Sequence, residues 1–305
     1  MPKLTVFLNF VLLGAVPSLL TQTPRIQPPQ MAARPSATSS DNSSPSVQQD
    51  VSYGTVDGQS LLLDVYDPGE HSDLRPAIVL IHGGGWTSFD KGTMRAMGMF
   101  LARSGFVAFS VDYRLFHGSE NRWPAQLDDV QRAVRWIRAN AAKYKIDPDH
   151  IGAFGHSAGA QLAALLGMEA TRDNSDAALA KYSSQVQAVV DVSGPSDFTT
   201  DHDPEGNAFL SAFLGGDFAH HPEIWRDASP VFHISKSNSP FLIVHGTQDS
   251  DVPMAQAEEL ADELKGAGVS VKLVKIEDGH TFRMPEARKQ LAFETQTFFF
   301  QHLRP

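Results

Sequence analysis

Ser157 is the residue best placed for covalent chemistry. It lies in the sequence GHSAG, Gly155–Gly159, directly after the apolar run Ile151–Phe154 and before the small-residue run Ala160–Leu166. A tight turn from a strand into a helix needs glycines where side chains would clash, and such a turn holds a serine hydroxyl on a rigid support. The pattern therefore predicts a nucleophile elbow, although a plain helix N-cap is the alternative role for this serine.

A serine hydroxyl needs a base to accept its proton, and the base needs an acceptor that orients it. Asp249 follows the apolar run Phe241–His245, and His280 follows the run Val271–Ile276. The chain order of serine, acid and histidine is the order that this kind of elbow uses. We therefore expect His280 to be the base and Asp249 to orient it.

Other acidic and imidazole groups compete for these roles. Asp251 lies two residues beyond Asp249, and either aspartate could instead cap a helix that begins near Pro253. Asp249 is preferred because it is nearer to the end of its strand. His82 and His156 are expected to hold loops through hydrogen bonds, and His245 to lie within a strand end. Three further histidines lack metal-ligand spacing, so no metal site is expected among His202, His220 and His221.

A glycine run supplies hydrogen-bond donors for a developing oxyanion. The sequence HGGGW, His82–Trp86, follows the apolar run Ala77–Ile81. Consecutive glycines let the backbone approach a substrate and direct its N–H groups inward. The expected oxyanion donors are the N–H groups of Gly84, Gly85 and Ala158.

The elements that must hold these residues alternate in a regular order. Apolar runs with β-type composition alternate with amphipathic segments from Val51 onward, which predicts an α/β fold with a mostly parallel sheet of about eight strands and helices on both faces. The first two strands flank Asp57-Gly58 and should pair antiparallel. The strands are expected at 51–56, 61–66, 77–81, 106–111, 151–154, 188–191, 241–245 and 271–276.

Helices are expected between most of these strands. The clearest follows Trp123-Pro124 and continues to Tyr144, with Asp147-Pro148 ending it. The segment Ser196–Ser239 breaks the alternation and is expected to form a small cap. Further helices are expected at 92–103, 158–168, 254–265 and 286–302.

Composition limits the possible partners. The 305-residue chain is 42% hydrophobic and has a formal net charge of −10 with no Lys/Arg cluster, which argues against binding to nucleic acid or to an anionic membrane surface. It contains no cysteine, so disulfides and thiolate chemistry are excluded. We expect a small-molecule or polysaccharide-linked substrate and no cofactor; the oligomeric state is left open.

The N-terminus has the composition of an export signal. Residues 1–20 carry Lys3 and the apolar block Val6–Val16, which predicts a signal peptide. The block is too short to span a bilayer, and no stable membrane span is expected in the mature protein. Residues 21–50 are rich in Pro, Ser, Thr and Gln and are expected to form a disordered linker. The catalytic domain is expected over 51–305, in an exported (periplasmic or extracellular) protein.

Together these motifs resemble those of a known group of hydrolases. From Val51 to the C-terminus it is similar to α/β-hydrolase esterases of the bacterial feruloyl-esterase-like and carboxylesterase group. The resemblance is carried by HGGGW, VDYR at Val111–Arg114, WPAQLDDV at Trp123–Val130, GHSAG, and HGTQDSDVP followed by Gly279-His280. It implies that Ser157 is the nucleophile, His280 the base and Asp249 its orienting partner. The hormone-sensitive-lipase branch usually reads DYRLAPE and GDSAG, where this chain reads DYRLFHGSE and GHSAG.

The predicted activity is hydrolysis of a carboxylic ester through an acyl-enzyme on Ser157. The alternatives are an arylformamidase or related amidase, a secreted peptidase acting on short peptides, and a binding protein on a hydrolase scaffold. Aromatic side chains are the expected substrate-pocket lining, namely Trp86, Phe198, Phe209 and Phe213.

Overall fold

Eight strands form one sheet in the computed structural model, which describes residues 44–173, 175–200 and 204–303. Their order is β1-β2-β4-β3-β5-β6-β7-β8. The strands are β1 (Ser46–Val56), β2 (Gln59–Asp67), β3 (Arg75–Ile81), β4 (Val107–Val111), β5 (Ile146–His156), β6 (Ala188–Val192), β7 (Phe241–Gly246) and β8 (Val271–Ile276).

The pairing is parallel except around β2. Strands β1 and β2 form the predicted antiparallel hairpin, and β2 also pairs antiparallel with β4. All other neighbouring strands are parallel. In the centre, Ile81 of β3 is in register with Gly155 of β5. The HGGGW loop and the GHSAG turn therefore leave the sheet side by side, and the predicted α/β-hydrolase fold is confirmed.

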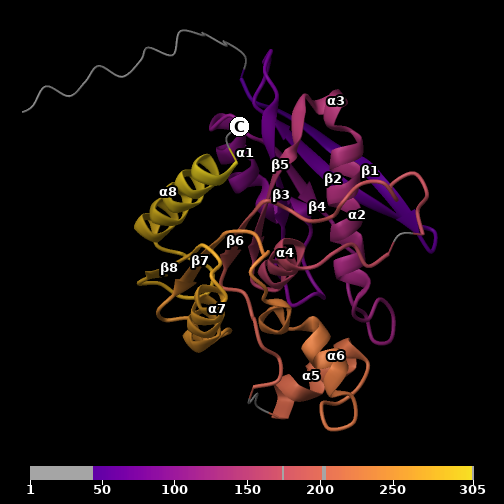
Figure 1. Cartoon of the computed structure of the whole chain (residues 1–305), viewed down its shortest axis with the longest axis vertical. Coiled ribbons are helices and arrows are strands. Elements are labelled where there is room, and N and C mark those ends of the chain that lie inside the picture. Colours follow the sequence, from indigo (N-terminus) through magenta and orange to yellow (C-terminus); the bar gives the residue numbers. More distant parts are fainter. Residues whose placement is uncertain (1–43, 174, 201–203, 304–305) are drawn as a thin grey trace, which may run out of the picture. The chain divides into compact units, whose positions relative to one another are not determined.

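Helices cover both faces of this sheet (Figure 1). On one face α1 and α8 bury apolar side chains such as Leu101 and Phe299, and on the other face α2, α4 and α7 bury Val130, Leu162 and Leu260. Both faces are apolar because parallel strands are covered on both sides. The helices in this layer are η1 (Lys91–Met94), α1 (Arg95–Arg103), α2 (Ala125–Ala139), α3 (Ala141–Tyr144), α4 (Ala158–Met168), α7 (Met254–Gly266) and α8 (Pro285–His302).

The helix expected to continue to Tyr144 is interrupted at Asn140. The Asn140 side chain donates a hydrogen bond to the Trp136 carbonyl, which satisfies the end of α2 and allows the short α3 to begin separately. Lys145 then turns the chain in a left-handed conformation, with a φ of 49°. Pro148 therefore does not end the helix as expected, because it lies within β5. The register between β5 and β3 is irregular there, and Pro148 needs no N–H to pair with a neighbouring strand.

The N-terminal boundary also differs from expectation. Strand β1 begins at Ser46, because Ser46, Val47 and Gln48 already pair with β2, so part of the expected linker belongs to the sheet. The predicted signal peptide and the linker up to residue 43 lie outside the described residues.

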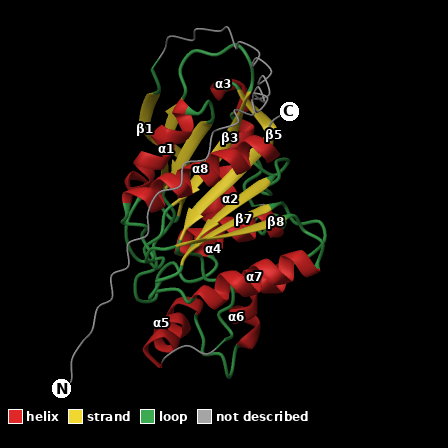
Figure 2. Cartoon of the chain, turned by 90° about the vertical axis from the view of Figure 1, so that its left-hand side faces the viewer, coloured by secondary structure: helices red, strands yellow, loops and turns green. Residues whose placement is uncertain are grey.

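A helical cap follows β6 at the place expected for it. It contains α5 (Pro204–Leu214), α6 (Pro222–Ala228) and η2 (Pro230–His233). In Figures 1 and 2, α5 and α6 lie together at the end of the molecule where α7 also lies. Buried Trp225 and Phe213 fix these short helices to the main core cluster.

Ion pairs attach the cap to the segment that follows α4. Within this cluster, His233 Nδ1 lies 2.9 Å from a Glu169 carboxylate oxygen, and Arg172 lies 2.8 Å from Asp227. Trp123 also donates its indole N–H to Asp227, at 2.8 Å. The pKa of His233 is raised above its ordinary value of 6.5, because the hydrogen bond and charge of Glu169 outweigh the opposing effect of burial.

The stability conferred by His233 should therefore depend on pH. A raised pKa means that the folded protein binds the proton more tightly, so this stabilisation is complete below pH 6.5 and is lost as the pH rises through the folded pKa. We expect His233→Gln to lower the Tm by roughly 2 °C more at pH 6 than at pH 9, as about 1 kcal/mol would in a domain of this size. Calorimetry at both pH values measures the difference. His220→Gln, at an exposed cap histidine, is the control, and equal losses at both pH values would contradict the prediction.

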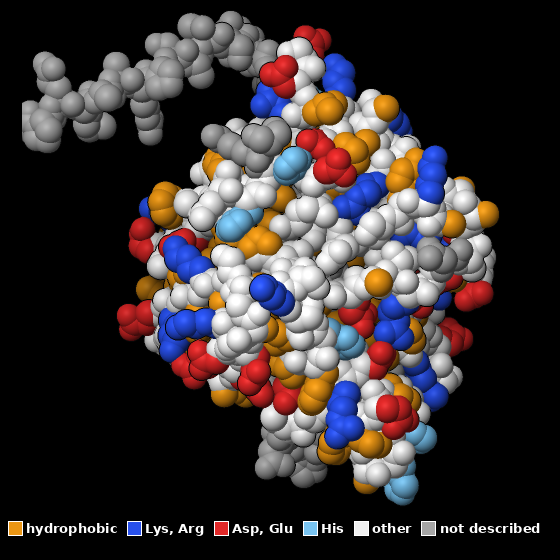
Figure 3. Space-filling model, viewed as in Figure 1, with side chains coloured by type: hydrophobic (Ala, Val, Ile, Leu, Met, Phe, Trp, Pro, Cys, Tyr) orange, Lys and Arg blue, Asp and Glu red, His pale blue; other side chains and the backbone are white. Residues whose placement is uncertain are grey.

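Lys and Arg side chains are scattered among Asp and Glu on the face seen in Figure 3. This distribution agrees with the dispersed charge of the sequence. Among the described residues, no helix has the length and apolar content needed to cross a bilayer.

Candidate active site

Ser157 lies on a strained turn between β5 and α4. Its φ is 55° and its ψ −124°, and its N–H donates to the Val192 carbonyl at 2.8 Å. A Cβ at Gly155 would lie 2.1 Å from the Gly159 carbonyl oxygen, and one at Gly159 would lie 2.3 Å from that of Ile81. Both glycines are thus required by close backbone contact, which is the local reason for the GHSAG spacing.

Three side chains from separate loops form a hydrogen-bonded chain. His280 Nε2 lies 2.8 Å from Ser157 Oγ, and His280 Nδ1 lies 2.7 Å from Asp249 Oδ2. A carboxylate can only accept, so Nδ1 carries the proton and Nε2 presents its lone pair to the serine hydroxyl. The three residues that the sequence analysis grouped together are therefore adjacent in space.

The Asp249 carboxylate is completely buried, yet it remains the anionic partner. Its Oδ1 accepts the N–H groups of Asp251 and Val252, each at 2.9 Å. Burial favours the neutral acid, but these N–H groups and His280 hold the Asp249 pKa below its ordinary value. The Asp251 side chain is exposed to solvent, and the partner of His280 Nδ1 is Asp249.

Two more histidines support this arrangement without contacting Ser157 Oγ. His156 donates from Nε2 to the His280 carbonyl at 2.9 Å, and buried His245 lies 2.9 Å from the Val252 carbonyl and 3.3 Å from Asp249. Burial lowers the pKa of both imidazoles, which keeps them neutral at neutral pH. Their hydrogen bonds fix the loops that carry His280 and Asp249.

The HGGGW loop runs beside the elbow. Gly84 and Gly85 have φ values of 106° and 57°, and neither N–H donates to another described residue. Together with the N–H of Ala158 at the start of α4, they are available to an incoming oxygen. Gly83 was not predicted as a site residue, although it belongs to the same glycine run. A Cβ at this position would lie 3.0 Å from Ser157 Cβ, so a glycine is needed beside the elbow.

A cavity of about 330 Å³ opens beside Ser157 and His280. Of the four aromatic residues expected to line it, Trp86 and Phe198 do so. Phe213 does not, because it stacks behind Trp86 with ring centroids 4.7 Å apart, and Phe209 lies in the same second layer, 6.4 Å from Trp86. Other lining residues were not predicted from the sequence. They come from the segment after β6, the cap and the loop that carries Asp249, namely Pro195, Leu210, Asp251, Val252 and Pro253.

Gln161 holds the Trp86 wall of this cavity in place. Its side chain is fully buried, accepts the Trp86 indole N–H at 3.1 Å, and donates to the Ala228 carbonyl at 2.8 Å. It thereby joins the glycine loop to the end of cap helix α6. The sequence offered one indication of this role. Gln161 is the one polar side chain of an otherwise apolar helix, and it lies a single helical turn after Ser157.

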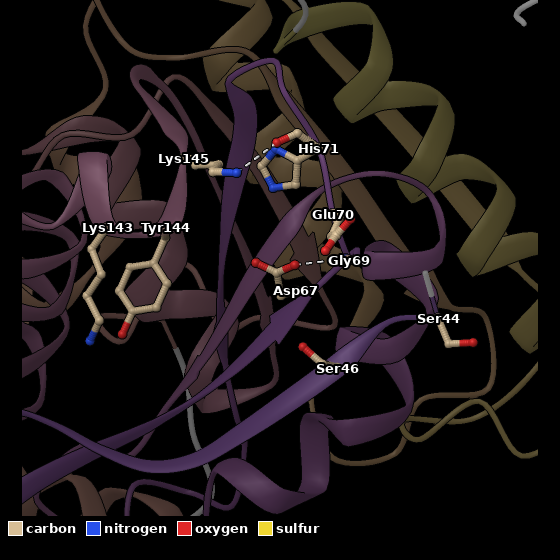
Figure 4. Close-up of a pocket in the computed structure, with 9 residues that line it drawn as sticks. All are labelled: Ser44, Ser46, Asp67, Gly69, Glu70, His71, Lys143, Tyr144 and Lys145. Carbon is tan, nitrogen blue, oxygen red and sulfur yellow. Dashed lines mark hydrogen bonds between the residues drawn. The ribbon is translucent and has the colours of Figure 1, made fainter. Parts of the chain in front are cut away.

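A larger cavity of about 410 Å³ lies elsewhere, lined by Asp67, His71 and Lys145 among others (Figure 4). It lies where β3 and β5 begin, since Lys145 immediately precedes β5 and its carbonyl accepts the Arg75 N–H. Open α/β sheets bind ligands at the opposite, carboxyl ends of their strands. The smaller cavity at Ser157 is therefore the candidate active site.

The chain is similar to known proteins over most of its length. The family model described as BD-FAE matches residues 63–264. Esterase LipC of Mycobacterium tuberculosis is 33% identical over 230 residues, which are 72% of this chain and 55% of LipC. The chain thus spans about half the length of the curated relatives it matches.

Solved structures extend the similarity across the fold. Esterase 2 of Thermogutta terrifontis phosphonylated by sarin has a TM-score of 0.73 and 29% identity, covering 86% of this chain and 96% of its own. A truncated carbohydrate esterase from gut microbiota has a TM-score of 0.70 and 28% identity, covering 86% of this chain and 98% of its own.

Proposed function

Because this chain belongs to the BD-FAE family, we propose that it hydrolyses carboxylic esters with Ser157 as the nucleophile. The observation that carries the proposal is the hydrogen-bonded chain from Ser157 through His280 to buried Asp249. The organophosphonate adduct of the Thermogutta relative adds support, since such reagents modify activated serine hydroxyls.

In the proposed reaction the Ser157 hydroxyl attacks the ester carbonyl carbon while its proton passes to His280 Nε2. The carbonyl oxygen becomes an oxyanion that accepts hydrogen bonds from the N–H groups of Gly84, Gly85 and Ala158, each contributing roughly 3 kcal/mol in the transition state. His280 then returns the proton to the leaving alcohol. Water, deprotonated by the same imidazole, attacks the acyl-enzyme and releases the acid and free Ser157.

The role proposed for Asp249 is orientation and charge. It holds the Nδ1–H tautomer of His280 and stabilises the imidazolium that forms during the proton transfer. Its lowered pKa keeps it ionised at neutral pH, where the base must act.

Two measurements on the wild-type protein test the proposal. A fluorophosphonate should modify Ser157, detected as a mass shift on its peptide. A substrate panel should show turnover of p-nitrophenyl esters, methyl ferulate or acetylated xylan, and little turnover of N-formylkynurenine or a peptide amide. Labelling followed by cleavage of the amides alone would assign an amidase instead, and a folded protein that neither reacts nor turns over any ester would contradict the proposal.

A further inference from the structure

A further cavity, of about 340 Å³, lies between α1 and α8, two helices that lie side by side on one face of the sheet (Figures 1 and 2). It shares no lining residue with the cavity at Ser157. Two of its lining residues, His156 and Val192, end strands β5 and β6. The cavity therefore lies at the carboxyl ends of the strands, where open α/β sheets bind ligands, although no step of the proposed hydrolysis uses it.

The walls of the cavity between α1 and α8 are mostly apolar. Met97 and Phe100 of α1 and Leu291 of α8 are half-buried against the core, and all three line the cavity. Met94 lies in the same wall, and methionine side chains adapt readily to the shape of an apolar ligand. The volume falls within the range of small-molecule sites, roughly 300 to 1,000 Å³. The interior therefore suits a hydrocarbon chain.

The charge at this cavity is positive. Arg288 is exposed and lines the cavity, and none of the described lining residues is an aspartate or a glutamate. A second guanidinium lies near, because Arg288 donates to the Arg283 carbonyl and Arg283 Nε donates to the Thr281 hydroxyl at 3.3 Å. Glu286, two residues before Arg288, pairs with Lys289 instead. Since a guanidinium pairs well with a carboxylate, the cavity suits an anionic group joined to an apolar chain.

The cavity between α1 and α8 also contacts the loop that carries the proposed base. Thr281 and Phe282, the two residues after His280, line it. His156 lines it as well and donates from Nε2 to the His280 carbonyl at 2.9 Å. Phe282 has a φ of 47°, a conformation that is costly for a residue with a Cβ. A ligand that packs on Phe282 would therefore support a strained segment next to His280.

We propose that the cavity between α1 and α8 binds an aliphatic carboxylate, and that the bound acid stabilises the loop that carries His280. The hydrocarbon chain packs on Met97, Phe100 and Leu291, and the carboxylate accepts hydrogen bonds from the Arg288 guanidinium. This site is separate from the cavity where Ser157 would attack an ester, so binding there does not require hydrolysis.

Octanoate is the probe that tests the proposal, and isothermal titration calorimetry measures its Kd. Met97→Trp fills the cavity with a larger side chain, and Arg288→Gln removes the guanidinium at an exposed position. We expect octanoate to bind the wild-type protein, and each variant to raise the Kd roughly tenfold, about 1.4 kcal/mol. Octanol has the same chain without the charge and should bind the wild-type protein roughly tenfold more weakly than octanoate.

Matched variants show whether octanoate binds at this cavity or elsewhere. Leu210→Trp fills the cavity at Ser157 in the same way, and Arg103→Gln removes another exposed guanidinium from α1. Neither variant should change the Kd for octanoate. Circular dichroism establishes that each variant is folded.

Hydrogen exchange tests the effect on the loop. At a concentration near the wild-type Kd, octanoate should slow amide exchange in a peptide that covers residues 278–284, because opening of this loop would then require loss of the ligand. The same concentration should have a much smaller effect in Arg288→Gln. A peptide from α7, which lines neither cavity with its helix body, should exchange at the same rate with and without octanoate.

Several results would overturn the proposal. These are absence of octanoate binding, equal affinity for octanol, or binding that is lost in Leu210→Trp and kept in Met97→Trp, which would place the acid at Ser157. Unchanged exchange in residues 278–284 with octanoate bound would refute the effect on the loop. Absence of p-nitrophenyl acetate turnover in the wild-type protein would refute only the proposed hydrolysis, since octanoate binding is measured without an ester.

Discussion

Replacing Ser157 with alanine should lower kcat for p-nitrophenyl acetate by about 10⁶-fold, since the attacking oxygen is lost and removal of a triad serine costs this order of magnitude. The fold should survive, because alanine has the same Cβ as serine at this φ of 55° and no partner other than His280 loses a side-chain hydrogen bond. Steady-state kinetics, together with the Tm of each protein, measure both parts of the prediction.

Ser193 provides a matched control. It also follows a parallel strand, β6, with a φ of 53°, and its buried hydroxyl has no partner among the described residues. Ser193→Ala should keep kcat within a few-fold of the wild-type value. Comparable losses in the two variants would mean that disturbance of the sheet edge, rather than loss of a nucleophile, explains the result.

Asp249→Asn should lower kcat by about 10⁴-fold with little change in KM. An asparagine amide would donate a hydrogen bond to His280 Nδ1 where the carboxylate accepts one. The proton would then reside on Nε2, facing Ser157, and the imidazole could not act as the base. The kcat and KM for p-nitrophenyl acetate at pH 8 test this, with circular dichroism to establish folding.

A variant at Asp251 shows whether the loss in Asp249→Asn comes from misorientation of His280 or from removal of a nearby negative charge. Asp251→Asn removes a carboxylate two residues away that lies at the mouth of the Ser157 cavity and does not touch His280. We expect its effect on kcat to be less than tenfold, from altered cavity electrostatics alone. A reversed order, with Asp251→Asn the more damaging change, would assign the orienting role to Asp251.

Local pattern was sufficient for most of the scaffold. Buried parallel strands need continuous apolar runs, and the antiparallel β1 and β2 flank the turn signal Asp57-Gly58, so all eight strands were found, with boundaries that differ by a few residues. The two errors at the end of α2 have a common cause. Asn140 caps the helix with its own side chain and Pro148 lies at an irregularity between β3 and β5, and neither event changes the hydrophobic period.

The candidate site was predictable only to the level of residue type and order. Ser157, Asp249 and His280 could be named because each follows a strand, and strand ends meet at one edge of the sheet. The aromatic lining was assigned less well. Phe209 and Phe213 lie on a cap helix whose rotation about its axis decides which side chain faces the cavity, and that rotation turned Leu210 toward it.

The fold class, the glycine-bounded serine and the order of its partners could be predicted from residue order, because these features depend on hydrophobic period and on local steric limits. Two other features became visible only in the folded chain: Asp249 rather than Asp251 reaches His280, and Gln161 joins the glycine loop to the cap. Each of these depends on the position of a side chain relative to residues far away in the chain. A hydrogen bond requires two atoms to lie about 3 Å apart. Hydrophobic periodicity predicts which face of a helix or strand carries a residue, but it does not predict the distance from that residue to a distant part of the chain.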